Sequence, residues 1–232
     1  MSTAPAGETA TSMPMPLQVA IDPLWFVVVV VVGFLVVGTV GPLLLGRLRD
    51  ARPPTDDERD ILDDLLVHVD LSLSGIDVVE TVGDRSIQTS VRGPPGRRKL
   101  VVTDYVLREL DGDVVRALLA AEAARTRLLY MEYRIVAAAA ILGLATAMFS
   151  GLVDFGDGLF LLAIGALVLF WIGRQLQYRA DARAADRVGA ETLADAFKHV
   201  AAVKGIELDD GGWRTWVEVQ PPLGRRIGRL RE

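Results

Sequence analysis

The sequence contains no cysteine and only two histidines. Without cysteine the chain can form no disulfide and can offer no thiolate to a metal ion. The histidines, His68 and His199, are far apart in the sequence and fall in amphipathic helical patterns, so we interpret both as ordinary helix residues. The side chains that most often hold zinc are therefore nearly absent from this chain.

Lysine is also scarce: there are three lysines among many arginines, aspartate outnumbers glutamate, and the formal net charge is −5. This acidic, lysine-poor composition resembles that of proteins from salt-loving (halophilic) archaea. A nucleic-acid-binding protein usually carries a basic surface, so we expect no nucleic acid partner.

Residues 1–23 lack Lys and Arg and are rich in small and polar residues, a composition that predicts disorder. Residues 24–45 then run almost without polar side chains and include six consecutive valines. At a rise of about 1.5 Å per residue this run can cross a hydrocarbon core of about 30 Å. A cleaved signal peptide is excluded, because no positive charge precedes the run and the run is too long.

Two further apolar runs, Ile135–Val153 and Leu159–Gly173, are separated by the polar segment 154–158. We interpret residues 135–176 as a transmembrane hairpin whose tight turn is that polar segment. A buried hairpin in a soluble core is the alternative, since the last run is short for a membrane span.

Arginines lie on one side of the three runs, whereas the hairpin turn holds only Asp154 and Asp157 as charged residues. The positive-inside rule therefore predicts an outside N-terminus and an outside hairpin turn. We expect a multi-pass protein of the cell membrane whose partner is the lipid bilayer and whose polar domain is cytoplasmic.

The polar parts, residues 46–134 and 177–232, mix helical and strand patterns. Thr55 and Glu58 form a capping box at the start of a helix that is expected to reach about Val69. Short strands are predicted at 77–82, 86–91 and 99–102, between turns rich in Gly and Pro. We expect a helix after Asp111 or Asp113 that continues unbroken into the second apolar run. Another is expected from about Arg174 to Lys204, ending at Gly205.

Four segments carry the most specific information, and they occur in a fixed order. The segments are Arg98-Lys-Leu-Val-Val-Thr-Asp-Tyr-Val-Leu-Arg-Glu-Leu110, Asp113-Val-Val-Arg-Ala-Leu-Leu-Ala-Ala-Glu-Ala-Ala-Arg125, Gln177-Tyr-Arg-Ala-Asp181 and Gln220-Pro-Pro-Leu-Gly-Arg-Arg-Ile-Gly-Arg-Leu-Arg231. Together they resemble the membrane zinc metallopeptidases of the HtpX and CAAX prenyl protease type (gluzincins) over roughly residues 55–232. The resemblance implies an α+β membrane protein, in which a metallopeptidase-like helical domain with a small β-sheet is combined with three transmembrane helices.

In that family the second segment carries H-E-x-x-H, in which two histidines bind zinc and the glutamate is the general base. Here the two histidine positions are Ala121 and Arg125, and only Glu122 matches. The third segment reads E-x-x-A-D in the family, but its zinc-binding glutamate is replaced by Gln177, and only Asp181 is kept. In the fourth segment, Gln220 stands where the family has histidine.

A catalytic zinc needs three protein ligands. Alanine offers no lone pair, arginine is permanently cationic, and a glutamine oxygen is a poor donor. We therefore expect no zinc, no other cofactor and no catalytic residue, and interpret the chain as a pseudoenzyme that binds a peptide or a membrane-protein partner. One alternative is a zinc endopeptidase with displaced ligands, for which two histidines supply too few donors. The other is a purely structural membrane protein.

Two finer expectations follow from the resemblance. The family sheet lines the substrate cleft and pairs with an extended peptide along its edge strand, so strand addition could survive here. The family aspartate supports a zinc-binding histidine, and that histidine position is now Arg125. We therefore predict that Arg125 pairs with Asp181, with Glu122 as a second acceptor.

Overall fold

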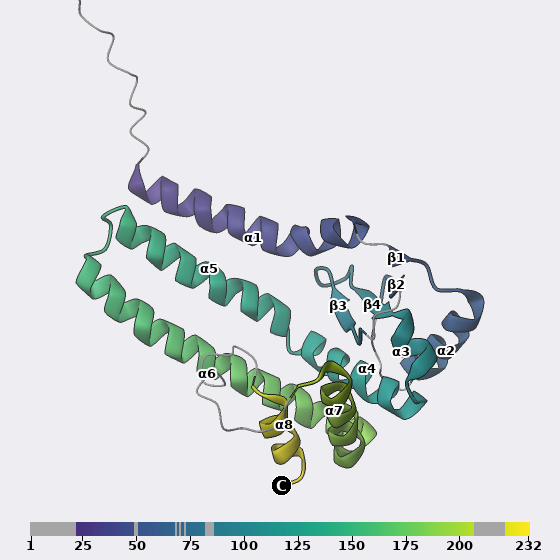
Figure 1. Cartoon of the computed structure of the whole chain (residues 1–232). Coiled ribbons are helices and arrows are strands. Elements are labelled where there is room, and N and C mark those ends of the chain that lie inside the picture. The colour runs from purple at the N-terminus through teal and green to yellow at the C-terminus, as the bar shows by residue number, and fades with distance from the viewer. Residues whose placement is uncertain are drawn as a thin grey trace, which may run out of the picture.

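The computed structural model describes residues 22–48, 51–67, 69, 71, 73–81, 86–206 and 221–232. Three of the described helices are long and apolar enough to cross a membrane: α1 (Pro23–Leu48), α5 (Tyr130–Phe149) and α6 (Phe155–Val188). They run alongside one another and project from the rest of the molecule (Figure 1). Their large apolar side chains are mostly exposed, as at Val29, Leu167 and Trp171. An apolar surface of this extent is stable against lipid rather than water, so the chain is a membrane protein.

The connection between α5 and α6 lies earlier than the sequence pattern predicts. Helix α5 ends at Phe149, Gly151 adopts a positive φ of 76°, and α6 begins at Phe155. The side chain of Asp154 accepts a hydrogen bond from the Gly156 N–H at 2.9 Å and so caps α6. The polar segment 154–158 is therefore the cap and first turn of a helix, and its expected role as the hairpin turn is wrong.

Two helix boundaries also differ from expectation. The helix α4 (Gly112–Arg127) does not continue into α5, because Leu129 adopts a left-handed conformation with φ 52°. Conversely, α6 runs without interruption from the membrane segment to Val188, and α7 (Ala190–Lys204) starts after Gly189, whose φ is 90°. Glycine adopts this conformation without the steric cost that a side chain would add. Gly205, with φ 62°, ends α7 as predicted.

A small sheet has the strand order β1-β2-β4-β3. The strands are β1 (Ala51–Arg52), β2 (Gly75–Val79), β3 (Thr89–Arg92) and β4 (Lys99–Thr103). The central pair, β2 and β4, is parallel, and both edge strands pair antiparallel. The sequence predicts the last three strands but not β1, whose two residues are too few to show an apolar alternation.

The expected capping box forms at the start of α2 (Asp56–Val67). The Thr55 N–H donates to Glu58 at 2.9 Å, and the Glu58 N–H donates to the Thr55 hydroxyl at 3.4 Å. Glu58 also accepts two hydrogen bonds from Arg52 of β1, at 2.6 and 2.8 Å. Hydrogen bonding to Arg52 lowers the pKa of Glu58 from 4.5 to about 2, so this buried carboxylate stays ionised and links the sheet to α2.

The core has two parts. One lies between the sheet, α2, α3 (Asp104–Glu109) and α4, and is built from branched aliphatic side chains such as Leu62, Leu100 and Val102. The other lies between α4, α6, α7 and α8 (Leu223–Leu230) and is built largely from alanine, with Phe197 and Ile227 as its larger members. Small side chains allow the helix backbones to approach closely, which brings α4 and α6 together where the sequence predicts the site.

Candidate functional site

The site residues expected from the sequence come together at the crossing of α4 and α6. Ala121 belongs to the alanine-rich core and is 1% exposed. On α6, Gln177 and Asp181 are one helical turn apart and are 2% and 3% exposed. Glu122 and Arg125 lie on α4 and are only partly buried. Gln220 and His68 fall outside the described residues.

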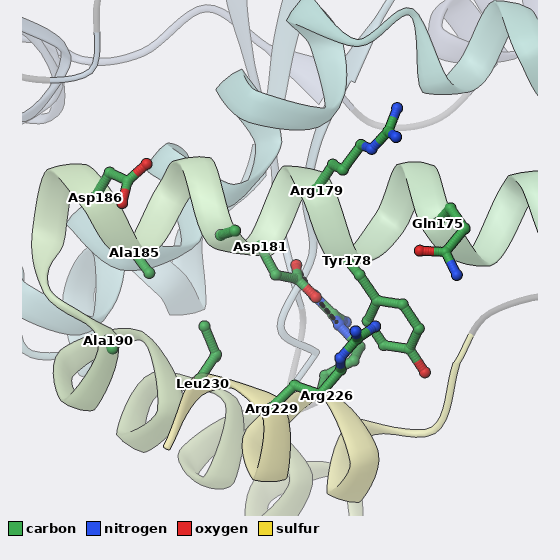
Figure 2. Close-up of a pocket in the computed structure, with 11 residues that line it drawn as sticks. Gln175, Tyr178, Arg179, Asp181, Ala185, Asp186, Ala190, Arg226, Arg229 and Leu230 are labelled. Atoms are coloured by element: carbon green, nitrogen blue, oxygen red, sulfur yellow. Dashed lines mark hydrogen bonds and ion pairs between the residues drawn. The ribbon is translucent and has the colours of Figure 1, made fainter. Parts of the chain in front are cut away.

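Asp181 is the centre of a buried ion-pair network. Arg226 of α8 donates from Nε to Oδ2 at 2.7 Å and from Nη2 to Oδ1 at 2.7 Å, a two-pronged pairing that suits the planar guanidinium (Figure 2). The Gln177 amide donates to Asp181 Oδ1 at 3.2 Å. The Arg226 guanidinium also lies over the Phe197 ring of α7, 4.1 Å from its centre. One buried carboxylate thus ties α6 to α8, and its arginine reaches α7.

The prediction that Arg125 pairs with Asp181 is wrong. Arg125 instead forms a hydrogen-bonded ion pair with Glu122, three residues earlier on the same helix. The oxygens of Asp181 are already taken by Arg226 and Gln177, whereas Glu122 lies one turn away on the same helix face. Arg125 therefore pairs with Glu122, which was expected only as its second acceptor, and not with Asp181.

Arg226 is the residue that the sequence reasoning missed. It stands in the fourth of the segments that carry the resemblance, so a signal was present in the sequence. Its partner could not be inferred, because 45 residues separate it from Asp181 and the pairing depends on how α8 folds back.

Two buried donors at this end of the molecule make no hydrogen bond within the described residues. They are the Nε of Arg125 and the hydroxyl of Tyr130, the first residue of α5. A buried donor without an acceptor costs about 1–3 kcal/mol, so a group that brought acceptor oxygens to these donors would be stabilised here.

The donor set does not fit zinc. Ala121 presents a methyl group, Arg125 a cation, and Gln177 an amide that is hydrogen-bonded to Asp181. Within the described residues no group of three or more His, Asp or Glu side chains could hold a metal ion. No step of chemistry can be derived through a metal at this place.

Comparison with solved structures supports the fold. The chain is similar to Ste24p of S. mikatae, a CAAX prenyl zinc metalloprotease, with a TM-score of 0.70 and 18% sequence identity. The similarity covers 91% of this chain but 59% of the Ste24p chain, so this chain matches only part of the larger protein. No protein-family model matches the sequence, and no curated protein does. The fold is similar to that of Ste24p, which agrees with the α+β membrane architecture that the four sequence segments imply.

Proposed function

We propose that this chain is a catalytically inactive relative of the membrane zinc metallopeptidases that binds an extended peptide or the exposed segment of a membrane-protein partner. The proposal rests mainly on one observation. The two carboxylates kept from the family pattern, Glu122 and Asp181, are each paired with an arginine, and the neighbouring positions offer no metal ligand.

Inactivity follows from the chemistry of these pairs. A glutamate that acts as general base in this family needs a metal-bound water beside it. Glu122 instead shares its Oε1 with the Arg125 guanidinium, and a fixed cation at this place repels a divalent ion. Asp181 has no histidine to orient and serves as a structural anchor for α8.

Peptide binding is supported by the free side of β3. Gln88 faces β4, because its carbonyl accepts from the Thr103 N–H at 3.1 Å. The alternation of a strand then directs the N–H and carbonyl of Thr89 to the opposite side, where β3 has no neighbour among the described strands. A strand with one unpaired side can accept an extended peptide as an additional strand.

The position of β3 links this edge to the candidate site. Strand β3 packs against α4, the helix that carries Glu122 and Arg125. The buried donors of Arg125 and Tyr130 lie at the same end of α4 and lack acceptors within the described residues. Peptide carbonyls supply acceptor oxygens, so a peptide that pairs along β3 and continues to this end of α4 would satisfy groups that are otherwise costly to bury.

We place the polar domain on the cytoplasmic side of the cell membrane, because arginine gathers on that side of the three spans. The absence of cysteine allows a clean test. A single cysteine at Asp157, in the first turn of α6, should react with a membrane-impermeant maleimide in intact cells, whereas one at Arg116 of α4 should react only after lysis. The reverse pattern would contradict this orientation.

The binding proposal is tested with photo-crosslinkable extended peptides on the purified full chain. We expect capture without hydrolysis. The variant Thr89→Pro, which removes an outward N–H at the first residue of β3, should weaken capture severalfold, since each lost hydrogen bond contributes about 1 kcal/mol. Thr89→Val keeps the N–H and the branched shape and is the matched control. Metal-dependent cleavage of the peptides, or equal capture by both variants, would refute the proposal.

A further inference from the structure

One face of α6 passes without a break from the membrane span into the polar domain. Ile164, Leu167, Trp171, Gln175 and Tyr178 follow one another at spacings of three and four, so they share one side of the helix. Leu167 and Trp171 are 69% and 62% exposed. A membrane span of about 20 residues that starts at Phe155 ends close to Arg174. Gln175 and Tyr178 therefore lie at the depth of the lipid headgroups.

A cavity of about 400 Å³ opens at this depth, between the C-terminal half of α6 and α8. Its lining includes Gln175, Tyr178, three arginines and two carboxylates: Arg179, Arg226, Arg229, Asp181 and Asp186. Figure 2 shows Tyr178 and the two α8 arginines gathered on the same side of α6, whereas Arg179 points away from them. The cavity thus joins the exposed apolar face of α6 at its membrane end.

The arginines at this cavity retain unused hydrogen-bonding capacity. The buried Arg226 spends Nε and Nη2 on Asp181, and its Nη1 makes no hydrogen bond within the described residues. The guanidinium of Arg229 lies over the Tyr178 ring, 4.3 Å from its centre, and forms no ion pair with a carboxylate of the part of the chain that the structure describes. Arg231, two residues further along the chain, differs from Arg229 because it forms an ion pair with Glu191 at 3.2 Å.

We propose that this cavity binds the phosphate of an anionic membrane lipid, with the acyl chains lying on the face of α6 formed by Ile164, Leu167 and Trp171. Arginine forks are well suited to phosphate oxygens, and Arg229 offers its fork here beside the remaining Nη1 of Arg226. Trp171 lies at the boundary between the apolar face and the polar cavity, where an indole is favoured. The site is separate from β3 and from the Glu122–Arg125 pair. The lipid proposal therefore does not depend on whether the chain binds peptides.

Binding of a fluorescent phosphatidylglycerol to the detergent-solubilised full chain tests this site. Arg229→Gln should raise the dissociation constant about tenfold, the effect of losing one charge-assisted phosphate contact. Arg229→Lys keeps the positive charge but lacks the planar guanidinium that stacks on Tyr178. Its dissociation constant should lie between those of wild type and Arg229→Gln. Arg231→Gln is the matched control, because it removes the same charge from an exposed, already paired position of the same segment. Arg229 is exposed, so thermal unfolding of Arg229→Gln without lipid should equal that of wild type.

Competition separates the possible sources of the phosphate. Unlabelled phosphatidylglycerol should displace the probe, while soluble glycerol phosphate at the same concentration should not, because it lacks chains to lie on α6. Equal weakening by Arg229→Gln and Arg231→Gln would mean diffuse charge attraction and would overturn the site. Displacement by glycerol phosphate as effective as that by the lipid would overturn the assignment to a membrane lipid.

Discussion

Glu122 and Asp181 are both kept from the metallopeptidase pattern and both paired with arginine, yet their surroundings differ. Asp181 is buried and bridges α6 and α8 through two hydrogen bonds to Arg226. Glu122 is partly exposed and pairs with Arg125 inside a single helix. The first pair holds separate elements together, whereas the second only balances charge locally. Asp181 therefore has a structural role between two helices, whereas the Glu122 pair contributes little to holding the fold together.

The largest expected effect comes from breaking the buried pair. Arg226→Met leaves Asp181 charged and buried without its main partner, so it should lower the free energy of unfolding by about 3–5 kcal/mol. The double variant Asp181→Leu/Arg226→Met strands no charge and should cost clearly less than Arg226→Met alone. Unfolding of the detergent-solubilised variants measures both. A double variant that is destabilised as much as Arg226→Met, or more, would show that the bridge is not coupled in this way.

A second effect, of nearly the same size, is expected at Glu58. Its pKa is about 2 in the folded chain against 4.5 for the free side chain, so its contribution to stability is complete above pH 4.5 and is lost as the pH falls toward 2. The shift corresponds to about 3 kcal/mol. Unfolding measured at a series of pH values should show wild type losing this stability in acid, while Glu58→Gln starts lower and changes less. Parallel pH profiles for the two proteins would contradict the assignment.

The smallest effect is expected at Glu122. A partly exposed ion pair within one helix contributes about 0.3–0.5 kcal/mol, so Glu122→Gln should leave the free energy of unfolding almost unchanged. Arg125→Ala should lower the free energy of unfolding only slightly more than Glu122→Gln does. Losses from either variant that match those at Asp181 would remove the distinction between the two carboxylates.

The sequence predicts local features well. The capping box of Thr55 and Glu58, the stop at Gly205 and the three apolar runs all depend on neighbouring residues, and they are found where expected. The break at Leu129 could not be predicted, because a left-handed conformation is rare for leucine and no glycine or proline marks the position.

The candidate site shows the same division. The absence of ligands at Ala121, Arg125 and Gln177 can be read directly from the family pattern. The partner of Asp181 cannot be read in this way, because Arg125 and Arg226 both lie within the four segments and only the folded position of α8 favours Arg226. Long-range pairings of this kind depend on tertiary structure.

The zinc content of the purified chain, measured by elemental analysis, tests the central claim most directly. We predict that the wild-type chain holds no stoichiometric zinc and leaves an unfolded substrate such as casein intact. The variant Ala121→His/Arg125→His/Gln177→Glu, which places three ligands on the crossing of α4 and α6, should gain zinc, while Ala121→His alone should not. One zinc per wild-type chain, lost when Glu122 or Gln177 is replaced, would contradict the account.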